Sequence, residues 1–428
     1  MRLAPLTLRS GYAWAIDPCQ DSITYLQLSE GLRHGHGFAR LDGNKLLGPE
    51  TFRLPGYPFF LSLMPTERTA IAVQAMVAGT MCLLIGLFVS ARWGPVAGVA
   101  ASALFAADIP SIVYSDEIMS DLVFGATVLF AMLVEFVAIR RKPPDYVAVG
   151  LMLLASALLG YSALVRPIGL FVAPLAIVAA LTTRANWRAR IAMALLVISI
   201  PALVVSLWIH RNKSLAGVSS FSTESGAQLL YYRAAGTLAY ANGDGWLAES
   251  AKMGTPPPQE YAARGARIIL SHPVAFAVMT LSSLSYLCVV PDRGPLEHLL
   301  GLGGAQSIQD PGSLRMRAAA HQLLKSPASA AVAIFEHEFR SSLIMLILVL
   351  IQIVVIAALW VGALLAVGNC RRRSFGTRVF VLLSLAVVFV ILVPASGPEA
   401  ISRYRVPAVP FLAMLAALGW FRRSVCEA

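Results

Sequence analysis

The stretch SSLIMLILVLIQIVVIAALWVGALLAVGN, residues 341–369, contains no ionisable side chain. A helix needs about 20 predominantly apolar residues to cross the hydrocarbon core of a bilayer. This stretch is longer than that, and three arginines, Arg371, Arg372 and Arg373, follow shortly after it. We therefore predict a membrane-spanning helix that ends at a basic connection.

The rest of the chain has the same character. Of its 428 residues, 57% are hydrophobic and only 13% are charged, and the mean hydropathy is +0.70. A soluble domain usually carries about a quarter charged residues, because its surface needs them. The composition excludes a soluble enzyme and predicts an all-α polytopic membrane protein, with a single transmembrane domain over residues 1–428. About ten transmembrane or membrane-embedded helices are expected, at residues 69–91, 94–112, 117–139, 145–163, 166–183, 190–209, 273–290, 341–367, 378–395 and 404–421.

The basic residues, which give a net charge of +11, form short clusters between the apolar runs rather than one face. Cytoplasmic connections of membrane proteins carry such an excess of Lys and Arg. The pattern therefore argues against nucleic-acid binding and assigns the connections around Arg140, Arg188 and Arg371 to the cytoplasmic side. The exoplasmic side then receives a first loop at residues 17–68, a large loop at residues 210–272 and several short turns.

Two places do not fit this topology. A single span at residues 273–290 would put the Arg371 cluster outside, so either this segment dips in and returns or a weak second crossing lies within residues 291–340. Nothing visible carries residues 17–68 across the membrane, and we expect that an upstream transmembrane helix is missing from this chain.

The metal-binding residue types are scattered. The five cysteines form no CxxC pair and have no histidine companion, so neither a zinc site nor a disulfide framework is expected. His34 and His36 have no evident third ligand. A divalent metal is therefore left open but not indicated, and no cofactor is certain.

The first polar cluster follows Asp21. On a helix, Asp21, Tyr25 and Ser29 share one face, which predicts a short helix on the membrane surface with a carboxylate at its start. Alternatively, Asp21 only caps that helix.

Two further clusters stand at expected membrane boundaries. Arg53 opens the run Arg-Leu-Pro-Gly-Tyr-Pro, which includes Tyr57, and the two prolines predict an irregular turn. Arg53 either pairs with lipid headgroups or binds a phosphate. Asp116, Glu117 and Asp121 lie within six positions, and helix capping explains one or two of them but not easily all three.

The last two clusters are arginines beside prolines. Arg166 lies between two apolar runs, where a guanidinium group needs an anionic partner. Arg403 and Arg405 flank Tyr404 at the start of the last run. Arginine forks match phosphate oxygens, so this pair predicts a phosphate clamp, although interfacial Arg and Tyr also anchor helices.

The order of these motifs resembles the glycosyltransferase-C superfamily, in the branch that contains protein O-mannosyltransferases and bacterial lipid A aminoarabinose transferases. The resemblance covers most of the chain, and it implies a polyprenyl-phosphate sugar as donor and transfer with inversion. It also implies roles for the candidate residues: Asp21 as the catalytic carboxylate, Glu117 or Asp116 as the second acidic position, Arg53, Arg166, Arg403 and Arg405 on the donor phosphate, and Tyr25, Tyr57, Tyr404, Tyr231 and Tyr232 as substrate contacts.

The expected partners are the lipid-linked sugar, membrane lipid and a lipid, glycan or protein acceptor. The expected location is a bacterial inner membrane, with the site facing outward in a role in cell-envelope biogenesis. In two respects the chain departs from the family: the helix before the Asp21 loop is absent, and the chain is short. Two rivals stay open. A transporter or lipid flippase should carry mid-span charges and an internal repeat, and an O-antigen ligase or polymerase should concentrate its charges in one late loop.

Overall fold

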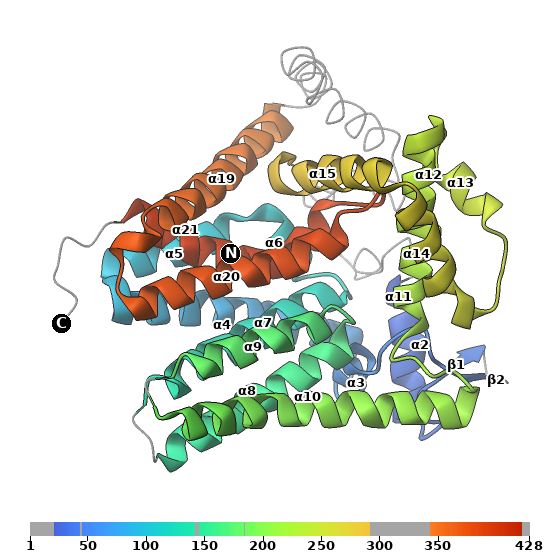
Figure 1. Cartoon of the computed structure of the whole chain (residues 1–428), viewed down its shortest axis with the longest axis horizontal. Helices are drawn as coiled ribbons and strands as arrows, with labels where there is room; N and C mark the ends of the chain where they lie inside the picture. Colours follow the sequence, from blue (N-terminus) through green and yellow to red (C-terminus); the bar gives the residue numbers. More distant parts are fainter. Residues whose placement is uncertain (1–20, 43–44, 142–144, 184, 292–342, 422–428) are drawn as a thin grey trace.

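The computed structural model describes residues 21–42, 45–141, 145–183, 185–291 and 343–421. Figure 1 shows a bundle of helices with a group of short helices and one β-hairpin at one end. The fold is all-α apart from that hairpin, as the composition predicts.

In the described part of the chain, six helices are long and apolar enough to cross a membrane, or seven if the bent pair described below counts as one span. They confirm the prediction of a polytopic membrane protein. The six are α4 (Glu67–Trp93), α7 (Ser120–Ala138), α8 (Tyr146–Val165), α10 (Trp187–Ala216), α19 (Leu343–Gly368) and α20 (Phe375–Ala395).

The other predicted spans are shorter helices. Helices α5 (Pro95–Ala107) and α9 (Gly169–Leu181) have 13 residues each. Helix α5 ends early because Asp108 caps a new short helix, α6 (Ile109–Val113). Likewise, a 3₁₀ turn, η6 (Ser402–Ala408), takes the first part of the last predicted span and leaves 12 residues to α21 (Val409–Trp420).

The segment at residues 273–290 forms helix α15 (Pro273–Val289), and it meets the helical segment that ends with α14 (Tyr261–Ser271) at 101°. A proline opens α15 and has no N–H to continue the preceding helix. This geometry is that of a broken span or a re-entrant segment. The alternative second crossing falls almost wholly in residues 292–342, which lie outside the described residues.

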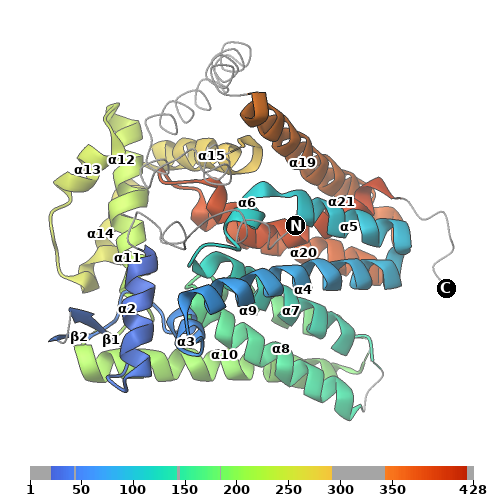
Figure 2. The ribbon, with the colours of Figure 1, turned by 180° about the vertical axis from the view of Figure 1, so that it is seen from behind.

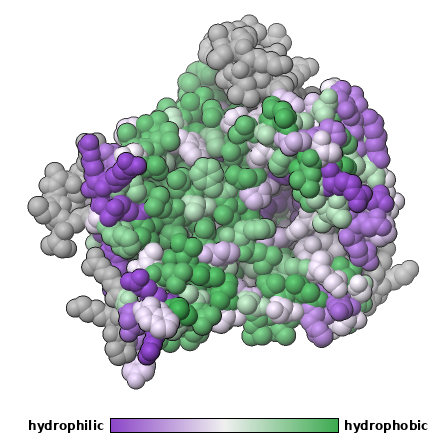
Figure 3. All heavy atoms as spheres, viewed as in Figure 1, coloured by the Kyte–Doolittle hydropathy of each residue, from purple (hydrophilic) through white to green (hydrophobic). Residues whose placement is uncertain are grey.

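Burial separates the inner helices from the outer ones. Helices α7 and α21 are buried along most of their length, whereas the outer helices expose large apolar side chains such as Leu83, Leu195 and Leu364, each at least 60% exposed. Figure 3 shows a broad hydrophobic face between hydrophilic ends. Such a face is compatible with lipid and not with water.

The basic connections gather at one end of the bundle. The Trp93 indole N–H donates to the Thr377 hydroxyl over 3.3 Å, which places the end of α4 beside the start of α20. The guanidinium group of Arg140, after α7, lies against Gly376. This common end agrees with the predicted sidedness; which compartment it faces stays a prediction.

The opposite end carries the polar segments (Figure 2). The first predicted loop contains α2 (Asp21–Arg33), an antiparallel hairpin of β1 (Ala39–Asp42) and β2 (Lys45–Pro49), and α3 (Gly56–Ser62). The large predicted loop is mostly helical, since α10 continues to Ala216. It then forms α11 (Thr223–Ala227), the π-helix η2 (Gln228–Ala234), α12 (Ala235–Asn242), α13 (Trp246–Lys252), η3 (Pro258–Glu260) and α14.

Helix α3 packs so closely on α8 that only glycine fits at position 56. A Cβ atom on Gly56 would lie 2.6 Å from the carbonyl carbon of Leu164 and 2.7 Å from the amide nitrogen of Val165. We expect Gly56→Ala to destabilise the protein by about 1–3 kcal/mol, because backbone cannot move aside easily. Thermal unfolding of the purified protein in detergent measures this.

Gly150→Ala is the matched control. Gly150 lies on the same helix α8, and nothing lies within 4 Å of the position that a Cβ atom would take there. A helical Ala at this position should leave the melting temperature unchanged or raise it. Equal melting temperatures for the two variants would contradict the tight contact.

Candidate functional site

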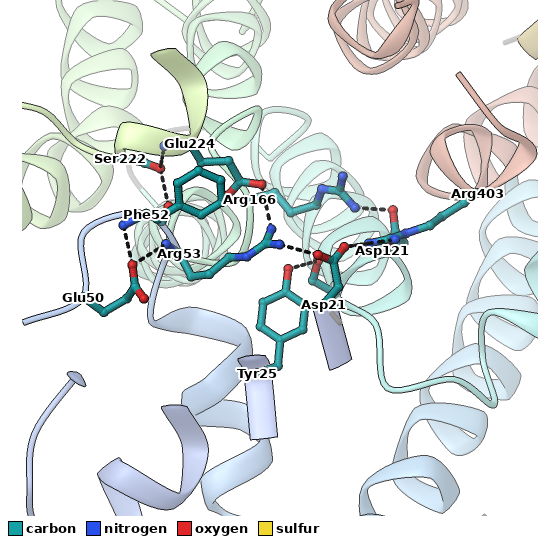
Figure 4. A network of polar contacts seen from close by, with 11 residues as sticks. Asp21, Tyr25, Glu50, Phe52, Arg53, Asp121, Arg166, Ser222, Glu224 and Arg403 are labelled. Carbon is teal, nitrogen blue, oxygen red and sulfur yellow. Dashed lines mark hydrogen bonds and ion pairs between the residues drawn. The ribbon is translucent and has the colours of Figure 1, made fainter. Parts of the chain in front are cut away.

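Asp21 lies between two guanidinium groups at the polar end of the bundle (Figure 4). One of its carboxylate oxygens pairs with Arg53, from the turn before α3. The other accepts from Nη1 and Nη2 of Arg403 over 3.2 and 3.3 Å. Three segments far apart in the sequence, α2, the turn before α3 and η6, therefore meet at this carboxylate.

A second carboxylate, Asp121 in the first turn of α7, shares Arg403 with Asp21. Its Oδ2 accepts from Nε of Arg403 over 2.7 Å, and its Oδ1 pairs with Arg166. Asp121 is fully buried. Because Arg403 bridges the two aspartates and each has one further arginine, the five groups form one continuous network.

A third carboxylate comes from the large predicted loop. Glu224, in the first turn of α11, lies 2.8 Å from Nη1 of Arg53. The hydroxyl of Ser222 donates to the Phe52 carbonyl over 2.7 Å, and the Thr223 N–H donates to the Thr51 carbonyl over 3.0 Å. Sequence reasoning missed Glu224, because Ser-Thr-Glu at this position has the pattern of an ordinary helix start.

Of the predicted tyrosines, Tyr25 and Tyr404 lie at the network. The Tyr25 ring packs under the Arg53 guanidinium at 5.3 Å, and its hydroxyl lies 3.3 Å from that of Ser120. The Tyr404 ring lies about 6 Å from the guanidinium groups of both Arg166 and Arg403.

Tyr57, Tyr231 and Tyr232 form their hydrogen bonds or ring stacking with residues outside the network. Tyr57 is fully buried behind Tyr25, and its hydroxyl donates to Gln74 over 2.6 Å. The Tyr231 hydroxyl donates to the Gly254 carbonyl over 3.0 Å, and Tyr232 stacks on Trp246. These contacts hold the helices together; substrate contacts by the three tyrosines stay a prediction.

Asp116 and Glu117, the predicted second acidic position, are buried just before α7. The chain there is held by Gln74, whose side-chain N–H donates to the Glu117 carbonyl oxygen over 2.7 Å. Asp121, four positions further along the chain, pairs with Arg166 and Arg403; a role for Glu117 or Asp116 as the second acidic position stays a prediction.

The Arg405 side chain does not join the network that contains Arg403. Its Nη1 donates to the Leu287 carbonyl oxygen over 2.7 Å, and its Nη2 lies 3.9 Å from Asp108. The clamp expected from the Arg-Tyr-Arg sequence is therefore not formed: only Arg403 and Tyr404 lie at the network.

The pKa values of two carboxyl groups in the network, those of Asp21 and Glu224, are shifted in opposite directions. Burial raises the pKa of Asp21, but the charges of Arg403 and Arg53 outweigh it and bring the pKa below the usual value. Burial also raises the pKa of Glu224, and here the opposing charge of Arg53 does not compensate, so this pKa stays above the usual value. Asp21 is accordingly the more firmly ionised of the two.

Within the described residues, no three His, Cys, Asp or Glu side chains lie together in a way that could hold a metal ion. The three carboxylates of the network each face a guanidinium group.

No protein-family model matches the sequence, and no curated protein matches it. Among solved structures, the chain is similar to the oligosaccharyltransferase AglB from Archaeoglobus fulgidus, in complex with an inhibitory peptide and a dolichol-phosphate. The identity is 12%, the TM-score is 0.49, and the match covers 92% of this chain and 45% of AglB. This chain thus spans about half the length of that protein.

The chain is also similar to ArnT from Cupriavidus metallidurans bound to undecaprenyl phosphate, with 16% identity, a TM-score of 0.40 and coverage of 97% and 76% of the two chains. Both proteins belong to the glycosyltransferase-C superfamily that the sequence motifs resemble. At these identities and TM-scores, the similarities do not assign an activity to this chain.

Proposed function

We propose that this protein is a membrane glycosyltransferase that moves a sugar from a polyprenyl-phosphate donor to an acceptor on the exoplasmic side of a bacterial inner membrane. The observation that carries the proposal is Asp21 between Arg53 and Arg403, with Arg166 and Asp121 completing the network. An anionic donor and a nucleophilic acceptor need this combination of guanidinium groups and an oriented carboxylate.

The three arginines would bind the donor phosphate. A phosphate diester carries one negative charge, and a second develops as its bond to the sugar breaks. Guanidinium groups placed where that charge develops stabilise the transition state more than the ground state. The same groups now bond carboxylates, so the phosphate must take over some of these bonds when the donor binds.

Asp21 would orient the acceptor and accept its proton. The acceptor oxygen forms a bond to the anomeric carbon from the face opposite the phosphate. The phosphate oxygen leaves with the bonding electron pair, the configuration inverts, and the acceptor proton passes to Asp21. If the acceptor is itself a phosphate, little deprotonation is needed and Asp21 mainly orients it.

Donor binding would also make Asp21 a better base. Its pKa is low because Arg403 and Arg53 outweigh the effect of burial. A bound phosphate offsets those two charges, and the pKa of the buried carboxyl group then rises.

This mechanism predicts that kcat and kcat/KM begin to fall at different pH values as the solution is acidified. The free enzyme governs kcat/KM and the bound complex governs kcat. We therefore expect kcat to begin falling at a higher pH than kcat/KM as the solution is acidified. If kcat and kcat/KM fall at the same pH, measured with a donor whose diester does not titrate in this range, donor binding does not raise the pKa of Asp21.

The first experiment is transfer of radiolabelled sugar from a panel of polyprenyl-phosphate donors in membranes that contain the protein. Label that moves to a lipid, glycan or protein fraction identifies the acceptor class. No transfer by well-folded protein, together with movement of a lipid-linked sugar across proteoliposome membranes, would favour a transporter or flippase. Transfer only from pyrophosphate-linked glycans would favour an O-antigen ligase or polymerase.

The proposed outward orientation of the site would require that donors made on the cytoplasmic side are flipped before use. A donor-making synthase and a lipid flippase are therefore proposed partners. The acceptor class stays open among lipid, glycan and protein.

A further inference from the structure

Arg403 and Arg405 point to different sides of the η6 turn. Arg403 bonds Asp21 and Asp121, while the Arg405 guanidinium group reaches the Leu287 carbonyl oxygen, near the end of α15. A 3₁₀ helix has three residues per turn, so side chains two residues apart leave its axis about 120° apart, and here they reach different partners. We therefore expect Arg403 and Arg405 to have different roles.

Arg405 lies beside a buried carboxylate in the protein interior. Arg405 is 1% exposed, and Asp108, whose Oδ1 lies 3.9 Å from its Nη2, is fully buried. Three hydrogen bonds orient the Asp108 carboxylate: the N–H and hydroxyl of Ser111 donate to Oδ2 over 3.0 and 2.6 Å, and Gln352 donates to Oδ1 over 3.0 Å. A buried carboxylate held in this way is a prepared counter-charge for Arg405.

These contacts join four elements of the fold. Asp108 begins α6, Gln352 lies in α19, and the side-chain oxygen of Gln352 accepts from the Ile109 N–H over 3.0 Å. Arg405 then ties α6 and α15 to η6. On the other side of η6, Pro407 packs against Gly125 of α7, where a Cβ atom would lie 3.0 Å from the Pro407 Cα.

We propose that Arg405 is a positioning residue: through Asp108, Gln352 and Leu287 it holds η6 against α7, so that Arg403 and Tyr404 face the Asp21–Asp121 network. This inference rests on the proposed transferase function only for its activity readout. The positioning role takes the place of the donor-phosphate contact that the sequence predicted for Arg405.

A double-mutant cycle between Arg403 and Arg405 separates positioning from direct phosphate binding. If Arg405 acts through Arg403, the double variant R403Q/R405Q should transfer sugar within about twofold of the rate of R403Q alone. If Arg405 binds phosphate independently, the double variant should lose the product of the two single effects, and the proposal is overturned. Asp108→Asn should reproduce the loss seen in R405Q, because it removes only the counter-charge.

Hydrogen exchange followed by mass spectrometry tests the anchor without any activity. The amides of residues 402–408 should exchange at least tenfold faster in R405K and D108N than in the wild type, while those of α8 stay protected. Unchanged exchange in η6 would overturn the anchor. R405K and D108N change the side-chain volume less than R405Q does or not at all, so they keep the test available if R405Q does not fold.

Arg264→Gln is the control for loss of an arginine. Arg264 forms an exposed ion pair with Glu260 on the polar end, and its loss should change neither η6 exchange nor transfer. If the wild type itself transfers no sugar, the proposed function fails, and the exchange data alone decide whether Arg405 anchors η6.

Discussion

Asp21→Asn is expected to lower the rate of sugar transfer at least a hundredfold, which corresponds to about 2.7 kcal/mol of barrier. The amide is nearly the same size, but it cannot accept the acceptor proton and cannot pair with Arg53 and Arg403 as a charge. The loss should fall mainly on kcat, because the carboxylate acts on the acceptor in the transition state. Initial rates with radiolabelled donor in purified membranes measure it.

Asp145→Asn is the matched control for this substitution. Asp145 caps the start of α8 at the other end of the bundle and pairs with Arg141, and Asn caps helices as well as Asp does. Transfer by the Asp145 variant should equal that of the wild type. Undiminished transfer by the Asp21 variant would keep the reaction class but remove Asp21 from its role, leaving Asp121 and Glu224 as the carboxylates to test.

Arg403→Gln is expected to reduce transfer by about 10²–10³-fold, the range found when one preorganised donor to a developing anion is removed. It should also destabilise the protein by about 3–5 kcal/mol, because Asp121 is fully buried and loses one of its two arginines. Arg403→Lys should recover only part of the rate, since one ammonium group cannot bond both aspartates as the fork does.

The double variant R403Q/D121N separates the catalytic loss from the folding defect. Removing both partners leaves no uncompensated buried charge at this contact, so the melting temperature in detergent should recover part of the loss seen in R403Q. Transfer should not recover, because the phosphate still lacks Arg403. A double variant that regains transfer together with stability would mean that Arg403 serves the fold and not the reaction.

Much of the site was predictable because its members stand in locally unusual positions. Arg166 and Arg403 are charges beside prolines at the ends of apolar runs, where a guanidinium group needs a partner. Asp21 and Arg53 lie in short polar segments before the first span. The apolar runs, together with the basic clusters between them, placed all four at one end of the bundle, and the structure brings them into one network.

The choice among neighbouring residues was not predictable in the same way. Helix α7 begins at Ser120, so Glu117 lies outside it and does not share a face with Asp121. The residue that meets the arginines therefore depends on where the helix starts, which differs by three residues from the predicted position 117. Glu224 reaches Arg53 only because the segment at residues 222–224 runs beside residues 51–53.

By itself, the sequence determined that this protein lies in a membrane, where most of its apolar segments fall, and which of its ends carries the paired charges. These properties follow from local composition, because lipid selects apolar runs and the membrane boundary gathers charge. Only the tertiary structure decided that Asp121 shares Arg403 with Asp21, that Glu224 joins them and that Arg405 turns away toward Asp108. Those choices depend on the direction in which each side chain leaves its helix, and packing between distant segments sets that direction.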